Sequence, residues 1–276
     1  MDTRDLGAVQ AQVLAIYRQL FPSGDPANIT NPFFWTHDAF TGRHPNYLPI
    51  DAKYHDFEHT LQGTLALARL LHGYAAAQAT PLLTQRAFEL GIIAILLHDT
   101  GYLKHRSDPE GTGAKYTLVH VSRSAEFART LLSEKGFPPQ EIRAVQNMIR
   151  CTGINAELPS IPFQSELERL VGYALGTADL LGQMAAGDYI DKLETLYQEF
   201  DESNRYNHKT TGPGIFTSAV ELRANTPVFW NKYVLPKVEN DFGGMHRFLA
   251  DSSGRNPYLE QIEANIARLQ RELVSA

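Results

Sequence analysis

The chain has 276 residues, of which 43% are hydrophobic and 20% are charged, and it carries a net charge of −6. This composition supports a substantial core in one large domain or two small ones, and the acidic balance argues against a nucleic-acid polymer as partner, because such binding needs a basic surface. A single cysteine rules out an internal disulfide, and the chain shows neither a secretory signal nor a membrane-crossing apolar run, so we expect a cytoplasmic protein with no membrane partner.

The spacing of apolar residues is helical nearly throughout, so we expect an all-α fold. Residues 5–21 form an amphipathic helix that ends before Pro22. Residues 22–53 carry five prolines and several aromatic side chains, and we expect this segment to be irregular. It would either pack over a site or wrap the surface of the core.

Four core helices follow, and a fifth comes after a proline-containing loop. They are expected at about 56–77, 82–98, 116–135, 139–153 and 165–185. A further helix is expected at about 188–202. Residues 213–276 should give two or three more helices, the last of them at about 257–275 after Asn256-Pro257.

Strand signals are weak, because little of the chain alternates between apolar and polar residues and no Asn-Gly hairpin occurs. No internal repeat or clear linker divides the chain. We therefore predict a single domain, with its core at about 54–185 and accessory helices in 205–276. The best minor boundary is the polar, glycine-containing stretch 201–214.

Five side chains that can bind metal fall on or at the ends of otherwise apolar helices. They are His55, His59, His98, Asp99 and Asp179. Asp179 follows three apolar residues at steps of four, so it interrupts a stripe that would otherwise be buried. Buried imidazoles and carboxylates are costly unless they are paired or bound to metal. The pattern predicts one metal site, and the alternative is a buried hydrogen-bonded network.

The ligand types indicate the kind of metal. Imidazole and carboxylate together suit one or two divalent ions of Mn, Mg, Zn, Fe or Ni. His98 and Asp99 are neighbours and would point about 100° apart on a regular helix, but both can reach one metal where the helix ends at Gly101. Asp99 could bridge to a second ion. Open positions would take water, which becomes a nucleophile when bound to metal.

With these residues in place, the chain resembles the HD superfamily of metal-dependent phosphohydrolases. Their pattern of His, His-Asp and Asp would correspond here to His59, His98-Asp99 and Asp179. The stretch Tyr54-His55-Asp56-x-x-His59 is similar to the Tyr-His-Asn-x-x-His signature of cyclic-nucleotide phosphodiesterases. The resemblance covers about residues 54–185. It implies an HD-domain helical bundle in which His55 is the general acid and His59 is a metal ligand.

A second part of the resemblance concerns His120. The stretch His120-Val-Ser-Arg-Ser124-Ala125 looks like a motif of HD and HD-GYP domains, where the histidine contributes to a second metal. The alternative for His120 is an ordinary core histidine. Tyr102 stands where the phosphodiesterases carry a further histidine, so the resemblance does not extend to cyclic nucleotides as the substrate.

Basic residues near these motifs are candidates for phosphate contact. Lys104, His105 and Arg106 come directly after the predicted metal pair, and Arg123 lies one turn beyond His120. A solvated loop and a paired or solvated arginine are the alternatives. We expect at least some of these cations to bind a small phosphorylated substrate.

The resemblance implies a hydrolase that cleaves a phosphomonoester or phosphodiester of a nucleotide or another small phosphorylated metabolite. A metal-activated hydroxide would attack phosphorus, with Asp99 holding the metal and His55 protonating the leaving oxygen. One alternative is an HD-fold di-iron oxygenase resembling inositol oxygenase, and another is a non-catalytic HD binding module. A homo-oligomer formed through the helices after residue 205 stays open.

Overall fold

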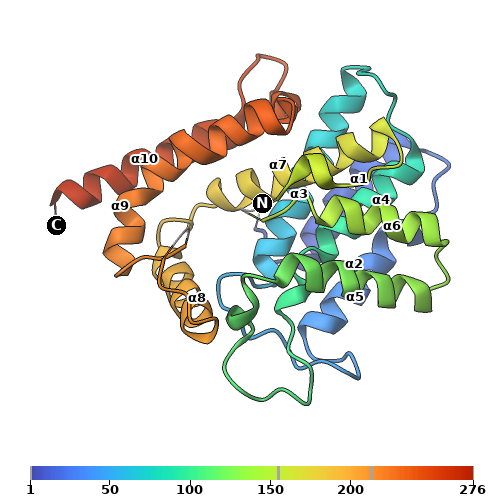
Figure 1. Ribbon diagram of the computed structural model, residues 1–276. Coiled ribbons are helices and arrows are strands. Elements are labelled where there is room, and N and C mark those ends of the chain that lie inside the picture. Colours follow the sequence, from blue (N-terminus) through green and yellow to red (C-terminus); the bar gives the residue numbers. More distant parts are fainter. Residues whose placement is uncertain (1, 154–155, 212–213, 276) are drawn as a thin grey trace.

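The computed structural model describes residues 2–153, 156–211 and 214–275, and these residues form helices without any strand. The all-α prediction is therefore confirmed. The α-helices are α1 (Leu6–Leu20), α2 (Ala27–Phe40), α3 (Phe57–Ala76), α4 (Gln85–Leu97), α5 (His120–Glu134), α6 (Pro139–Ile149), α7 (Glu166–Met184), α8 (Leu193–Tyr206), α9 (Ala219–Phe229) and α10 (Pro257–Ser275). Figure 1 shows α7 between the cluster α1–α6 and the last three helices.

Shorter helical segments connect these elements. The 3-10 turns are η1 (Thr100–Tyr102), η2 (Gly113–Tyr116), η3 (Leu158–Ser160) and η6 (Met245–Leu249), and the π-helical segments are η4 (Trp230–Val234) and η5 (Lys237–Asp241). The polar stretch 201–214 begins as the last turns of α8, and its residues 212–213 lie outside the described part of the chain. None of the helices that the structure describes is long and apolar enough to cross a membrane.

The segment 22–53 contains a helix that the sequence analysis did not predict. α2 begins after Pro26 and contains Pro32, which lacks a backbone N–H and so disfavours a helix. Pro26 lies at the N-terminal boundary, where a missing N–H costs little, and Phe33 and Phe40 pack into the core from this helix. Burial of these rings therefore outweighs the low helix propensity of the segment.

The core lies around α3, α4 and α7. From Ile92 to Leu97 every side chain of α4 is buried, which matches the absence of a polar face in its sequence. α3 packs along α7 at a close crossing: a Cβ added to Gly182 would lie 3.1 Å from the backbone of Gln62 and Gly63. The missing side chain of Gly182 therefore lets the two helices approach closely near His59 and Asp179.

Candidate metal centre

Three of the predicted ligands lie at helix ends, and the fourth lies in the interior of a helix. His59 lies in the first turn of α3, where the N-cap side chain of Asp56 accepts a hydrogen bond from its backbone N–H at 2.9 Å. His98 is the C-cap of α4, and Asp99 follows it at the start of η1. Asp179 comes from the interior of α7. The end of α4 thus presents two neighbouring side chains to the crossing of α3 and α7.

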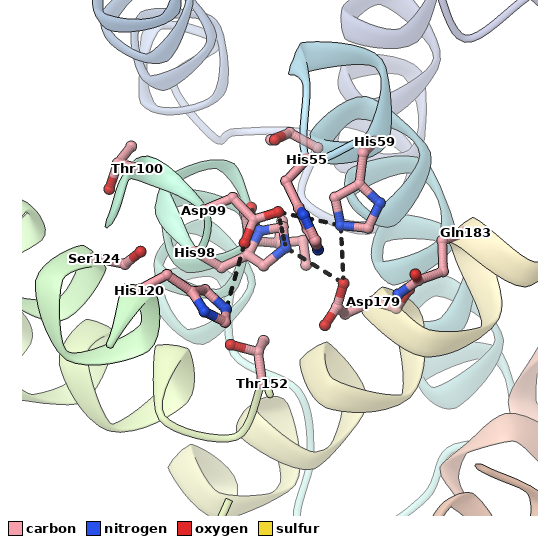
Figure 2. Close-up of polar contacts among 12 residues, drawn as sticks. His55, His59, His98, Asp99, Thr100, His120, Ser124, Thr152, Asp179 and Gln183 are labelled. Atoms are coloured by element: carbon pink, nitrogen blue, oxygen red, sulfur yellow. Dashed lines mark hydrogen bonds and ion pairs between the residues drawn. The ribbon is translucent and has the colours of Figure 1, made fainter. Parts of the chain in front are cut away.

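Four donor atoms from these residues form a closed ring (Figure 2). The Nε2 atoms of His59 and His98 each lie 3.2 Å from Oδ2 of Asp99 and 3.3 Å from Oδ1 of Asp179. The donor atoms of His59, His98 and Asp99 also lie within 4.8 Å of one another. The structure therefore brings together the residues that the His, His-Asp and Asp pattern singled out.

The spacing of the ring fits one metal ion. Two donors that are each about 2.1 Å from a metal lie about 3.0 Å apart at a right angle and about 3.4 Å apart at the tetrahedral angle. The four neighbouring separations of 3.2–3.3 Å lie between these two values. A central ion would therefore contact all four atoms without a large rearrangement.

Hydrogen bonding supports the same conclusion. Nε2 of His98, Oδ2 of Asp99 and Oδ1 of Asp179 are buried polar atoms without a hydrogen-bond partner. The other ring nitrogen of His98, Nδ1, donates to the carbonyl oxygen of Ile95 at 2.6 Å, which leaves the lone pair of the neutral ring on Nε2. With neutral imidazoles these atoms have no hydrogen-bond partner and are available as ligands, so the buried His-His-Asp group could hold a metal ion.

Within the ring, imidazoles and carboxylates of opposite charge lie close together. Burial lowers the pKa of His59, but the contacts with Asp179 and Asp99 outweigh it and raise that pKa to about 9. Burial raises the pKa of Asp99, but the positive charges of His98 and His59 outweigh it and hold the pKa well below its usual range. The carboxylates are thus ionised and available as ligands.

His120 lies beside the outer oxygen of Asp99. Its Nε2 is 3.8 Å from Oδ1 of Asp99, the oxygen that faces away from the ring (Figure 2). Its Nδ1 donates to the carbonyl oxygen of Thr117 at 2.7 Å, so Nε2 is again the free nitrogen. Asp99 therefore presents one oxygen to the ring and the other to His120, as a carboxylate that bridges two ions would.

His55 lies next to the ring and is paired with a residue to which the sequence analysis gave no role. Its Nδ1 is 2.6 Å from Oε2 of Glu199 in α8, and Oε1 of Glu199 accepts the backbone N–H of Tyr54 at 2.7 Å. Glu199 is buried, yet the positive field of His55 keeps the pKa of Glu199 below its usual value against the effect of burial. In the sequence Glu199 is indistinguishable from Glu194, an exposed glutamate of the same helix.

The predicted phosphate-binding cations have protein partners in this structure. The Nζ atom of Lys104 is buried against Asp51 and the carbonyl oxygen of Gly111. Arg123 donates from Nε to the carbonyl oxygen of Gly101 and from Nη2 to that of Leu103. Substrate contact by these side chains stays a prediction, and for Lys104 it requires an ion pair to open.

The other two basic residues lie on the surface. Arg106 donates to carbonyl oxygens of the loop after α2, among them those of Gly42 and Pro45. The ring of His105 is exposed, and its Nδ1 lies 2.9 Å from the hydroxyl of Ser107. These contacts fix the loop that follows η1, and phosphate binding by this pair is likewise a prediction.

Comparisons with known proteins give one family. No curated protein matches the chain. The model of the Npun_R2479-like family matches residues 45–272, a span that contains every residue of the centre described above, from His55 to Glu199. The chain therefore belongs to the Npun_R2479-like family.

Proposed function

We propose that the protein is a metal-dependent phosphohydrolase that cleaves a phosphomonoester or phosphodiester of a nucleotide or another small phosphorylated metabolite. One observation carries the proposal: a ring of four ligand atoms, three of them buried without a hydrogen-bond partner, lies beside a histidine–glutamate pair. An ion-binding ring alone would serve structure as well as catalysis. A proton donor next to it is what hydrolysis of a phosphoester needs in addition.

The residues of the four-atom ring would bind the metal. His59, His98, Asp99 and Asp179 would hold one divalent ion, and Asp99 with His120 would hold a second. A bound divalent ion supplies charge neutralisation at the phosphoryl oxygens and an activated water. The α3–α7 crossing and the end of α4 keep the four side chains in place, so little has to be ordered on binding.

His55 has the task of proton transfer. Because Glu199 accepts the hydrogen bond from Nδ1 of His55, a protonated His55 carries its transferable proton on Nε2. After that proton has passed to the leaving oxygen, the neutral ring keeps the Nδ1–H bond to Glu199. Glu199 therefore fixes both the tautomer and the direction of the ring.

The test is hydrolysis of bis-p-nitrophenyl phosphate, p-nitrophenyl phosphate and a nucleotide panel in the presence of Mn, Mg, Zn, Fe or Ni. Turnover by the wild-type protein and its loss in Asp99→Ala would support the proposal, with Asp38→Ala, which changes an exposed aspartate, as the control. Activity retained in Asp99→Ala would contradict the mechanism.

The same preparation separates the two rival functions. A di-iron oxygenase would load iron without oxygen, show the optical signature of coupled irons and leave the phosphoesters intact. A binding module would fold normally, hold metal weakly or not at all and turn over nothing. Metal analysis of the purified protein, run alongside the substrate panel, distinguishes these outcomes.

A further inference from the structure

Tyr102 is a buried aromatic residue that contacts both histidines flanking the metal ring. It lies in η1, three residues after Asp99, and it is fully buried. Its ring is stacked on the imidazole of His55, with centroids 4.5 Å apart and an interplanar angle of 13°. It is also stacked on the imidazole of His120, at 4.7 Å and 22°. One aromatic ring thus contacts two imidazoles, whose own centroids are 6.2 Å apart.

Each of these imidazoles has one hydrogen bond that fixes its position. His55 is bonded through Nδ1 to Glu199, and His120 through Nδ1 to the carbonyl oxygen of Thr117. An imidazole with a single hydrogen bond can still turn about the axis of that bond. Contact with a flat aromatic face removes that freedom, because turning the imidazole would break the stacking. Each such aromatic pair changes an equilibrium constant by about two- to tenfold.

We propose that Tyr102 is a positioning residue whose ring sets the orientation of both His55 and His120. The role of His55 in this inference rests on the proposed function, whereas the role of His120 concerns ion binding alone. The consequence is a coupling: loss of the ring should weaken the proton-donor position and the second-ion position together. The four-atom ring of His59, His98, Asp99 and Asp179 should stay intact, since none of these side chains stacks on Tyr102.

The ring of Tyr102, rather than its hydroxyl, carries this role. The hydroxyl oxygen is buried without a hydrogen-bond partner among the described residues. Removing an unsatisfied buried hydroxyl costs little and can stabilise a protein. The backbone of Tyr102 is held independently of its side chain, because its N–H donates to the carbonyl oxygen of Asp99 at 3.1 Å. Tyr102→Phe should therefore keep the positioning role, and Tyr102→Leu should lose that role without unfolding η1.

The test compares these two variants with the wild type by calorimetric titration with Mn²⁺ and by hydrolysis of bis-p-nitrophenyl phosphate. In Tyr102→Leu we expect an unchanged first ion, a second ion that binds about two- to tenfold more weakly, and a kcat lowered by a similar factor with little change in KM. Tyr102→Phe should match the wild type in all four quantities. The control is Tyr74→Leu, which removes another buried tyrosine, whose ring contacts Phe248; it should lower the melting temperature and leave ion binding unchanged.

Several results would overturn the inference. Tyr102→Leu could bind the second ion as tightly as the wild type, or Tyr102→Phe could be as damaging as Tyr102→Leu, which would assign the role to the hydroxyl. A wild-type protein that binds only one ion would also overturn it. Failure of the proposed function looks different: the wild type then hydrolyses no phosphoester, and the two-step Mn²⁺ titration still decides whether Tyr102 positions His120.

Discussion

The Nε2 atom of His98 lies 3.3 Å from the Oδ1 atom of Asp179, although the two residues come from α4 and α7. Neither atom has a hydrogen-bond partner. A separation of this size is what two ligands of one ion show. This contact is the long-range relationship on which the candidate metal centre depends.

Asp179→Asn should therefore abolish tight binding of the first ion. An amide is neutral and a weaker ligand than a carboxylate, and changes to residues that only support a ligand already cost about 10–100-fold in metal affinity. We expect a loss at least as large, measured by calorimetric titration with Mn²⁺. Asp188→Asn is the control, since Asp188 pairs with Arg4 and Lys192 away from the ring. Equal affinity in the Asp179 variant and the wild type would remove Asp179 from the ligand set.

Gly101→Ala should separate His120 from Asp99. A Cβ at Gly101 would lie 2.0 Å from the carbonyl oxygen of His120, so α5 would have to move away from η1. Forcing atoms into a packed contact costs about 1–3 kcal/mol. We expect a lower unfolding free energy and weaker binding of the second ion, measured by urea unfolding and by Mn²⁺ titration. Gly187→Ala is the matched control, because its Cβ would meet nothing within 4 Å.

The sequence predicted most of the helices because their apolar periodicity is strong. The last helix, α10, was expected at about 257–275 and spans Pro257–Ser275, and α7 was expected at about 165–185 and spans Glu166–Met184. The sequence did not predict α2, because the five prolines of the segment 22–53 lower its helix propensity. Tertiary burial stabilises this helix all the same. Local propensity is informative only where packing does not oppose it.

Some residues of the candidate site could likewise be predicted from the sequence, and others could not. His98 and Asp179 could be picked out because a polar residue in an apolar helix is conspicuous in a sequence. Glu199 could not, since α8 has three glutamates and only the fold shows that this one reaches His55. The contacts of Lys104 could not be predicted either, because its partners Asp51 and Gly111 come from loops whose paths the sequence does not specify.

Glu199→Gln should lower kcat without removing the metal. The amide cannot stabilise a protonated His55, and it can present its NH₂ group to Nδ1, which would reverse the tautomer of the ring. Loss of general-acid assistance typically costs about 10²–10⁴-fold. We expect a decrease in that range in phosphoester hydrolysis with unchanged metal content. Glu194→Gln, an exposed position in the same helix, should behave as the wild type; an equal loss in both variants would point to damage to α8 as a whole.

Glu89→Gln should destabilise the fold through a buried carboxylate far from the chemistry. Glu89 accepts hydrogen bonds from Tyr17 of α1, Asn28 of α2 and Gln85 and Arg86 of α4. Gln cannot satisfy all these donors and removes the charge opposite Arg86, so we expect a loss of about 2–4 kcal/mol in the free energy of unfolding at pH 7. Glu126→Gln, on the surface of α5, should change it by less than about 1 kcal/mol.

The effect of Glu89 should depend on pH in a defined direction. Burial raises the pKa of Glu89, but the hydrogen bonds from Tyr17 and Arg86 outweigh it and lower that pKa below the ordinary value. The folded protein therefore binds this proton less readily than the unfolded chain, whose glutamate titrates near pH 4.3. The stabilisation is complete above about that pH and is lost as the pH falls through the folded-state value. Urea unfolding of wild type and Glu89→Gln between pH 7 and pH 3 should show the difference shrinking only below about pH 4. A difference that stays constant to pH 3 would show that folding does not shift the pKa of Glu89.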